Sequence, residues 1–290
     1  MEDSSTGRTL LERVTAATGH LSPQERRVAE YMLANPQQVA ASSAADVAKL
    51  ARASDATVIR TAQSLGYAGF SELRKSLILG SSRRTAADIL EDRIAHAGGE
   101  NDLAIAVRDS VDVIGMLGTD RVGDAWDAAF TLLASSERVW TLGFGPAGSL
   151  ADFLALSLVR IGLEATAMTT TGFRLADDLL RFRRGDVLVV FAPVRLFREI
   201  DAALAHARET GVGTVVVTEA LGMVLDGKAD VVLSTPETTH NSASELTAGL
   251  VLAHSLVLHL AKANRGESRG RMDDLNRLRT RIAGPALDAS

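Results

Sequence analysis

The first eighty residues of this 290-residue chain carry apolar positions at helical spacing, with frequent polar interruptions. In the stretch LSPQERRVAEYML, Ser22 precedes a proline at the first helical position, and Glu25 follows at the third, which is the arrangement of a capping box. The apolar stripe behind this cap ends at Pro36. Residues 9–79 are therefore expected to be helical, with several breaks.

Two short helices in this region are separated by a tight turn. Ser43 is expected to cap the first helix, whose inward side is rich in alanine, and Ser54 is expected to cap a second helix that runs to about Leu65. Two short helices joined by a turn of about three or four residues, with small side chains where they cross, are typical of a helix-turn-helix. In such a unit the second helix enters the major groove of DNA.

The second of these helices supplies the candidate DNA contacts. Its spacing predicts a buried side formed by Val58, Ala62 and Leu65, and an exposed polar side opposite. An arginine there can donate to guanine or phosphate, and basic residues on the next helix can contact the DNA backbone. The predicted DNA-binding residues are Ser43, Ser54, Thr57, Arg60, Thr61, Ser64, Arg74 and Lys75. The pattern alone leaves open a helical cap with a solvated polar face.

From residue 137 the pattern alternates between short apolar strands and amphipathic helices. Strands are expected at residues 139–142, 165–168, 186–192, 214–219 and 229–235, and helices at 148–160, 173–180, 197–211 and 246–263. Because the strands alternate with helices and are apolar on both faces, the expected class is α/β with a doubly wound parallel sheet. The predicted organisation is an N-terminal all-α helix-turn-helix domain (1–84), a helical connector (85–124) and an α/β domain (125–290).

Charge and composition narrow the classes of partner. The formal net charge is −5, but residues 1–84 hold 11 Lys and Arg against 8 Asp and Glu, a net of +3 that suits a polyanion. The chain contains no cysteine, which excludes disulfides and thiolate metal sites. The longest apolar stretch, residues 246–261, is interrupted by His254 and His259 and is short for a membrane span. With its polar, acidic start, the chain is expected to be cytoplasmic, with no membrane segment.

A glycine motif follows the first expected strand of the α/β domain. Gly143, Gly145 and Gly148 spell G-x-G-x-x-G, the pattern that lets a backbone approach a phosphate closely. A nicotinamide site of this kind needs a carboxylate about twenty residues further on, at the end of the second strand. That end holds residues 169–171, which are all threonine, and Glu164 stands at the wrong end of the strand. No cofactor is therefore expected.

Both domains resemble parts of one protein family. The segments LSPQERRVAEYMLANP and ADVAKLARASDATVIRTAQSLGYAGFSELRKSL, within residues 9–79, resemble the DNA-binding head of RpiR/MurR-type bacterial transcription regulators. Residues 125–262 resemble a SIS (sugar isomerase) domain, through Gly143, Gly145, the Arg-Ile-Gly of residues 160–162 and the strand segments GDVLVVF and TVVVT. The resemblance implies a transcription regulator whose phosphosugar-sensing domain controls operator binding.

The resemblance also implies where a ligand would bind, and where this chain differs. The family's Ser-x-Ser-Gly-x-Thr loop falls on residues 192–197, where Ala192, Val194, Arg195 and Phe197 replace Ser, Ser, Gly and Thr. The cradle of hydroxyls and glycine is lost, but an arginine can pair with an anionic ligand. The predicted ligand-binding residues are Gly143, Gly145, Ser149, Thr170, Arg195, Asn241, Ser242 and Glu245. For Ser242 and Glu245 the sequence favours a helix cap over a ligand contact.

Together these features predict a regulator that binds operator DNA and a small anionic metabolite, as a homodimer or homotetramer, without enzymatic activity. His254 and His259 lie on an apolar helix and are expected to be core or interface residues, because no metal-ligand spacing is present. One alternative is a sugar-phosphate isomerase with Glu245 or His240 as its general base. The other is a DNA-binding protein whose SIS domain only oligomerises.

Overall fold

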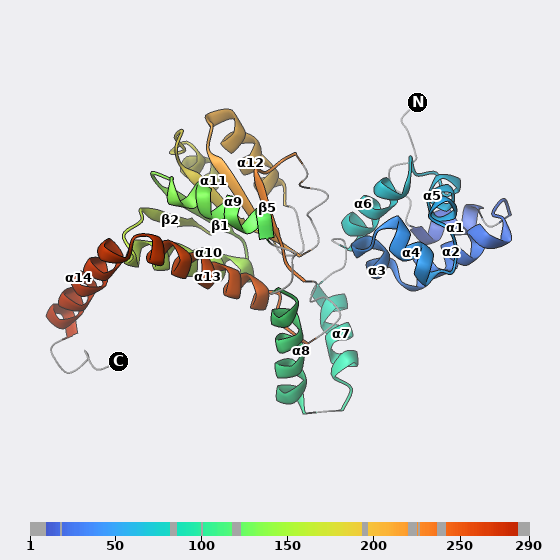
Figure 1. Ribbon diagram of the computed structural model, residues 1–290, viewed down its shortest axis with the longest axis horizontal. Helices are drawn as coiled ribbons and strands as arrows, with labels where there is room; N and C mark the ends of the chain where they lie inside the picture. Colours follow the sequence, from blue (N-terminus) through green and yellow to red (C-terminus); the bar gives the residue numbers. More distant parts are fainter. Residues whose placement is uncertain are drawn as a thin grey trace. The chain divides into compact units, whose positions relative to one another are not determined.

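The computed structural model describes residues 10–17, 19–81, 86–99, 101–117, 123–192, 197–219, 225, 227–236 and 242–283 (Figure 1). The chain divides into two compact units, Met1–Asp88 (unit 1) and Ile89–Ser290 (unit 2). Each unit has its own buried core.

Unit 1 is helical throughout its described part. Its helices are α1 (Leu10–Ala17), α2 (Pro23–Ala34), α3 (Pro36–Ala41), α4 (Ala44–Leu50), α5 (Asp55–Ser64) and α6 (Phe70–Ser81). The capping box predicted at the start of α2 is confirmed, because the Glu25 N–H donates to Ser22 Oγ at 3.3 Å and the Ser22 N–H donates to Glu25 Oε2 at 3.0 Å. Capping satisfies amides that have no partner inside the helix, so it fixes where each helix begins.

The core of unit 1 lies where α5 packs against α2 and α4. Val28, Val47 and Val58 are fully buried there. The small residues Ala48 and Ala62 are also buried, which lets the helices approach closely at their crossing. The burial predicted for Val58 and Ala62 is therefore confirmed.

Unit 2 is built on a sheet of five parallel strands. These are β1 (Val139–Gly143), β2 (Ala165–Met168), β3 (Val187–Phe191), β4 (Gly213–Thr218) and β5 (Val231–Ser234), in the order β2-β1-β3-β4-β5. In register, Val139 lies opposite Ala165 on β2 and Val187 on β3. The chain starts near the middle of the sheet and adds strands on both sides, so the predicted doubly wound parallel sheet is confirmed.

Helices cover both faces of this sheet (Figure 1). One face packs against α9 (Gly123–Ala134), α10 (Pro146–Arg160) and α13 (Thr247–Ala263), and buries Val139, Val189 and Val215. The alternate residues Trp140 and Leu188 are fully buried on the other face, which α11 (Phe173–Leu179) and α12 (Arg198–Thr210) cover. This alternation follows from the two-residue repeat of a strand.

Three helices of unit 2 lie outside these two layers. They are α7 (Ala86–Ala97), which begins three residues before the unit boundary, α8 (Asp102–Leu117) and α14 (Arg265–Ala283). The polar α14 was not predicted from the sequence, and Ser268 Oγ ties it to the carbonyl of Ile161 at 3.1 Å. Among the described residues, no helix is both long enough and apolar enough to cross a membrane.

Candidate functional site

The helix-turn-helix of unit 1 consists of α4, the turn of residues 51–54, and α5. The turn is closed by a hydrogen bond from the Ala53 N–H to the Ala48 carbonyl at 2.8 Å, and Arg52 adopts a left-handed conformation with φ of +52°. Ser54 Oγ then accepts from the Thr57 N–H at 3.2 Å, so the predicted cap of α5 is confirmed. The hydrogen bond across the turn, the conformation of Arg52 and the Ser54 cap together fix the angle between α4 and α5.

The exposed face of α5 is formed by Ala56, Ile59, Arg60 and Gln63, which follow one another at helical spacing. Arg60 is exposed as predicted, and its guanidinium can donate to guanine or phosphate. Ile59 is 41% exposed, although it is a large apolar residue. The sequence analysis missed Ile59 and Gln63, whose spacing from Arg60 already placed them on the same face.

The structure corrects the prediction that Thr57 and Thr61 lie on this face. Thr57 is 3% exposed and Thr61 is fully buried. Thr61 Oγ1 donates to the Thr57 carbonyl at 2.8 Å, and Thr57 Oγ1 lies 2.9 Å from Ser54 Oγ. A threonine hydroxyl that bonds within its own helix no longer needs water, so its side chain can be buried. These two threonines therefore belong to the core of unit 1.

The remaining predicted DNA contacts all have hydrogen-bond partners within the unit, except for the exposed Lys75. Ser43 caps α4 and donates to Asp46 Oδ2 at 2.6 Å. Ser64 Oγ donates to Glu25 Oε1 at 3.0 Å. Arg74 Nε donates to the Ala40 carbonyl at 3.0 Å, and burial lowers the pKa of Arg74. Their contacts with DNA remain predictions.

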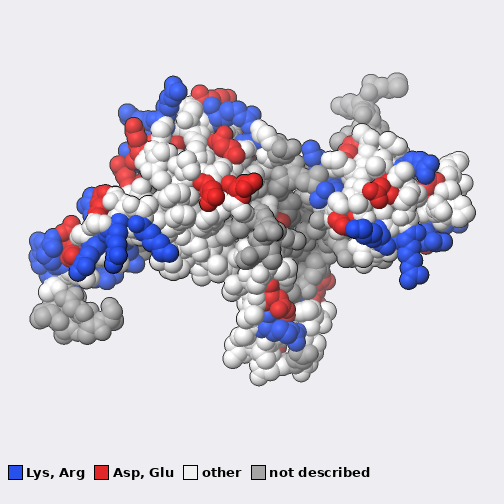
Figure 2. Space-filling model, viewed as in Figure 1, with Lys and Arg blue, Asp and Glu red and all other residues white. Residues whose placement is uncertain are grey.

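Lys and Arg side chains gather along one edge of unit 1, below α2 and α4 in the view of Figure 2. The exposed basic residues of α2, α4, the turn and α5 are Arg26, Arg27, Lys49, Arg52 and Arg60. Phosphate contacts dominate the affinity of proteins for DNA, and basic side chains on the elements that form a helix-turn-helix supply them.

In unit 2 the glycine motif forms a tight turn between β1 and α10. A methyl group on Gly143 would lie 2.7 Å from the carbonyl carbon of Ala147, so only glycine fits there. Gly145 precedes α10 with φ of +57° and ψ of −132°, a conformation that L-residues rarely adopt. The turn brings the first residues of α10 to the carboxyl edge of the sheet, where helix amides and the helix dipole favour an anion.

Two further predicted ligand residues lie at this edge with exposed side chains. Ser149 Oγ, on the first turn of α10, donates to the Pro146 carbonyl at 2.6 Å and keeps its lone pairs for a ligand. Thr170 is exposed in the segment that follows β2. Arg195 and Asn241 lie outside the described residues.

The described ends of the substituted loop after β3 are apolar. Ala192 is buried, and the ring of Phe197 lies edge-on to Phe144, with 6.1 Å between the ring centroids. Val194 lies outside the described residues. At these two positions, where the resemblance implies hydroxyl side chains, the chain carries a methyl group and an aromatic ring.

The structure corrects the expected helix cap at Ser242 and Glu245. Helix α13 begins only at Thr247, and its cap residue, Leu246, makes no side-chain capping bond. Instead, the Ser242 N–H donates to Asp109 Oδ2 at 2.7 Å, while Ser242 Oγ is buried without a hydrogen-bond partner among the described residues. Ser242 thus lies outside the helix and bonds a residue that is distant in the sequence. Both Ser242 and the half-buried Glu245 thus stand at the carboxyl edge.

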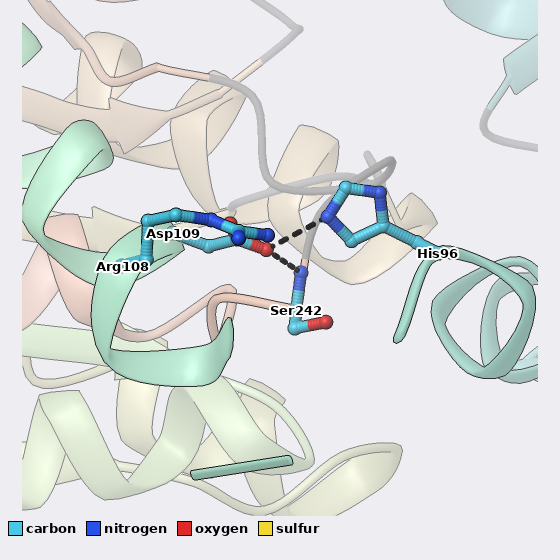
Figure 3. A network of polar contacts seen from close by, with 4 residues as sticks. All are labelled: His96, Arg108, Asp109 and Ser242. Carbon is cyan, nitrogen blue, oxygen red and sulfur yellow. Dashed lines mark hydrogen bonds and ion pairs between the residues drawn. The ribbon is translucent and has the colours of Figure 1, made fainter. Parts of the chain in front are cut away.

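Asp109 is the centre of a polar network that the sequence analysis missed (Figure 3). Its carboxylate bonds the Ser242 N–H, lies 3.0 Å from His96 Nε2, and lies 3.4 Å from Arg108 Nε. Burial raises the pKa of Asp109, but hydrogen bonds from Ser242 and His96 and the charge of Arg108 outweigh it, so the pKa is lower than usual. An ionised carboxylate is therefore buried beside the carboxyl edge.

The two histidines of α13 take different positions. His259 stacks on Phe130 of α9, with ring centroids 3.9 Å apart, whereas His254 is exposed. In the part of the chain that the structure describes, no three His, Asp or Glu side chains are arranged to hold a metal ion.

Comparison with known sequences matches both units. Residues 8–83 match the family model of the helix-turn-helix domain of the rpiR family, and residues 132–259 match that of the SIS domain. The HTH-type transcriptional regulator HexR of Pseudomonas aeruginosa is 30% identical over 221 residues, which cover 73% of this chain and 73% of that protein. The HTH-type transcriptional regulator YbbH of Bacillus subtilis is 28% identical over 222 residues, which cover 74% of this chain and 75% of that protein.

Solved structures share the same architecture. The Vibrio vulnificus NanR protein complexed with ManNAc-6P has a TM-score of 0.63 at 21% identity, covering 94% of this chain and 99% of that one. The sugar isomerase domain of an RpiR transcription factor from Sphaerobacter thermophilus has a TM-score of 0.56 at 21% identity, covering 60% and 98%. A helical N-terminal region followed by a SIS fold, together with the sequence matches, shows that this chain belongs to the RpiR family of helix-turn-helix transcription regulators.

Proposed function

We propose that this regulator binds its operator through the exposed face of α5 and senses an anionic, phosphosugar-like metabolite at the carboxyl edge of its sheet. The observation that carries the DNA interface is the capped, exposed α5, which presents Arg60 and Gln63 beside basic residues of α2, α4 and the turn. A helix of this kind reads base edges with its exposed side chains, and the surrounding cations bind phosphates. The DNA-binding domain is taken as residues 1–84, joined by a connector, 85–124, to the sensing domain, 125–290.

The metabolite site is supported by three features that meet at one edge. The turn at Gly143 and Gly145 presents the start of α10, Ser149 and Thr170 are exposed there, and the Ser242 hydroxyl is buried without a partner among the described residues. The bound ManNAc-6P of the similar NanR structure favours a sugar phosphate. Because Ala192 and Phe197 replace hydroxyl residues, we propose that Arg195 pairs with the anionic group.

We propose that the protein works as a homo-oligomer, at least a dimer. One side of α8 carries Leu103, Val107, Val111 and Ile114, which are between 41% and 73% exposed and form a continuous apolar stripe (the α8 stripe). A monomeric protein rarely leaves such a surface in water. A second copy of this chain is the occupant that also supplies a second helix-turn-helix for the other half of an operator.

We propose that the protein is not an isomerase and that it acts in the cytoplasm. Isomerisation needs a general base beside an anchored sugar phosphate. Glu245 is half-buried, but the hydroxyl loop that would anchor the substrate is apolar at its described ends, Ala192 and Phe197. A regulator of bacterial transcription needs only binding at this edge, and it must share a compartment with DNA. Turnover of glucose 6-phosphate or N-acetylmannosamine 6-phosphate by the purified protein would overturn this part of the proposal.

Operator binding is tested by titrating the purified protein with the DNA upstream of its own gene at two salt concentrations. Wild-type protein should prefer this fragment to scrambled DNA and should lose affinity steeply with salt. Arg60→Ala should weaken specific binding about tenfold or more, because a bidentate contact to guanine contributes roughly 1–3 kcal/mol. Arg271→Ala, which removes an exposed arginine of α14, is the matched control and should bind normally. Equal affinity for all DNA in wild-type and Arg60→Ala would contradict the proposed interface.

Metabolite sensing is tested by a thermal-shift screen of sugar phosphates. A metabolite that binds the native state raises Tm, by an amount that corresponds to about 2.7 kcal/mol at one hundred times its Kd. Ser242→Ala should reduce the shift, whereas Ser135→Ala, at the exposed end of α9, should leave it unchanged. If no sugar phosphate raised Tm, the interpretation that the SIS domain only oligomerises would be favoured.

A further inference from the structure

Asp109 is a charged residue on the buried face of α8, which lies opposite the exposed α8 stripe. Its neighbours one turn away on either side, Ile105 and Val113, are buried, and Asp109 itself is 6% exposed. An ionised carboxylate in such a place costs stability unless protein partners replace its water. The partners of Asp109 therefore show which parts of the chain this residue connects.

The two closest partners come from different parts of the chain. Asp109 Oδ2 accepts from the Ser242 N–H at 2.7 Å and lies 3.0 Å from His96 Nε2 (Figure 3). Ser242 lies between β5 and α13, 133 residues further along the sequence, whereas His96 stands in the last turn of α7. One carboxylate oxygen thus joins the carboxyl edge of the sheet to α7.

The Ser242 side chain faces away from this bond. Figure 3 shows its hydroxyl directed away from Asp109, and Ser242 Oγ is buried with no partner among the described residues. A buried hydroxyl without a partner is unfavourable, and an oxygen of a bound metabolite would satisfy it. The same residue therefore bonds Asp109 through its backbone and keeps its side chain for a ligand.

Helix α7 is the place where the polypeptide passes from unit 1 to unit 2. It begins at Ala86, and unit 2 begins at Ile89. Its 12 residues form one continuous helix, with His96 in the last turn. One continuous helix therefore connects His96 to residues 86–88, the last residues of unit 1.

We propose that Asp109 is a positioning residue that couples the metabolite site at the carboxyl edge to α7, and through α7 to operator binding. This coupling rests on the proposed metabolite site. In one arrangement Asp109 bonds both Ser242 and His96, and in the other it does not. A metabolite that bonds the Ser242 hydroxyl shifts the equilibrium between these two arrangements. Because coupling between two sites is reciprocal, DNA binding must in turn alter the segment around Ser242.

The test uses DNA as its probe, so the metabolite need not be known. Hydrogen–deuterium exchange is measured on the full chain, both free and saturated with a duplex that the protein has selected from random-sequence DNA. In wild-type protein, DNA should change exchange within residues 242–246 by about fivefold or more. In Asp109→Asn that change should vanish, and the Ser242 amide of the free protein should exchange roughly tenfold faster, because a neutral amide oxygen replaces the charged acceptor.

Two other variants separate coupling from general damage. Asp112→Asn makes the same substitution at an exposed position of α8 and should retain the DNA-dependent change. His96→Ala removes only the α7 partner of Asp109, so the Ser242 amide should stay protected while the DNA-dependent change is lost. This variant also tests the coupling if Asp109→Asn does not fold.

The coupling is overturned if DNA binds wild-type protein without changing exchange in residues 242–246, or if the change persists in both Asp109→Asn and His96→Ala. Failure of metabolite sensing has a different signature, which is the absence of any sugar phosphate that raises Tm. The two outcomes are therefore distinguishable, because the exchange experiment contains no metabolite.

Discussion

Replacing Gly143 by alanine is expected to destabilise unit 2 through a backbone clash. A methyl group at this position would lie 2.7 Å from the carbonyl carbon of Ala147 and 3.1 Å from the amide nitrogen of Gly148. Both atoms belong to the first turns of α10, which packs against β1 and β2. Backbone atoms cannot turn aside as a flexible side chain does, so β1 or α10 must shift. Overpacking of this kind typically costs about 1–3 kcal/mol.

Tryptophan fluorescence isolates the unit concerned, because Trp126 and Trp140, the two tryptophans of the chain, both belong to unit 2. Urea unfolding followed by this signal gives the free energy of unfolding by linear extrapolation. Gly270→Ala is the matched control, since Gly270 lies inside α14 and an added methyl group meets nothing within 4 Å. Alanine favours a helix over glycine by roughly 0.8–1 kcal/mol, so the two variants should differ by about 2–4 kcal/mol.

Two results would contradict the expected effect of Gly143→Ala. A Gly143→Ala protein that unfolds at the same urea concentration as wild-type would show that the β1–α10 turn relaxes without cost. A destabilised Gly143→Ala protein that still binds its sugar phosphate with unchanged affinity would show that the metabolite site does not need this turn geometry.

Three further predictions concern other parts of the molecule. Because the Thr61 hydroxyl bonds inside α5, Thr61→Val should change DNA affinity by no more than about twofold. Gln63→Ala, on the exposed face of α5, should weaken DNA binding roughly tenfold, and fluorescence anisotropy measures both affinities. Val107→Asp places a charge in the α8 stripe and should yield monomers in sedimentation velocity, where wild-type protein sediments as a dimer or larger. Burial raises the pKa of Asp109, but its hydrogen bonds and the charge of Arg108 keep this pKa below the usual value for aspartate. The ionised Asp109 therefore stabilises the fold at pH values above the usual pKa, and this stabilisation is lost as the pH falls through the lowered pKa. The free energy of unfolding of Asp109→Asn, measured by urea titration, should therefore fall less than that of wild-type protein when the pH is lowered from about 5 to about 3.

The sheet and the helix caps could be predicted because both depend on short stretches of sequence. Residues 165–168 form a strand as expected, because a short and mainly apolar segment between polar turns is typical of a strand in a parallel sheet. Ser22 and Ser54 cap their helices as expected, because a capping bond spans only three residues. Strands and helix caps can therefore be predicted from the few residues that form them.

The exposed face of α5 could be predicted only in part, because α5 packs against α2 as well as α4. Helix α6 also packs against α5, and these three partners widen the buried arc of α5 beyond its apolar positions. Thr57 and Thr61 fall within this arc, and their hydroxyls find partners inside the helix. The sequence pattern treats a threonine as polar and exposed, so this burial has no local signal.

The contact between Asp109 and Ser242 could not be predicted either. The two residues are 133 positions apart, and each has a simpler local explanation: Asp109 looks like a surface charge and Ser242 looks like a helix cap. The fold brings the buried face of α8 to the segment before α13, and the N–H of Ser242 then has a carboxylate partner. Helix α13 starts five residues later, at Thr247.

The G-x-G-x-x-G motif illustrates how packing alone can require a pattern associated with nucleotide binding. Gly143 is needed because the backbone of Ala147 approaches it, and a methyl group on Gly148 would meet the Gly143 carbonyl oxygen at 3.2 Å and Thr169 at 3.4 Å. Gly145 is needed because its φ is +57°. None of these requirements involves a dinucleotide. The start of α10 lies at the carboxyl edge, where the helix dipole favours any anion, so the choice of ligand must rest on the surrounding side chains, such as Ser242, and not on the glycines.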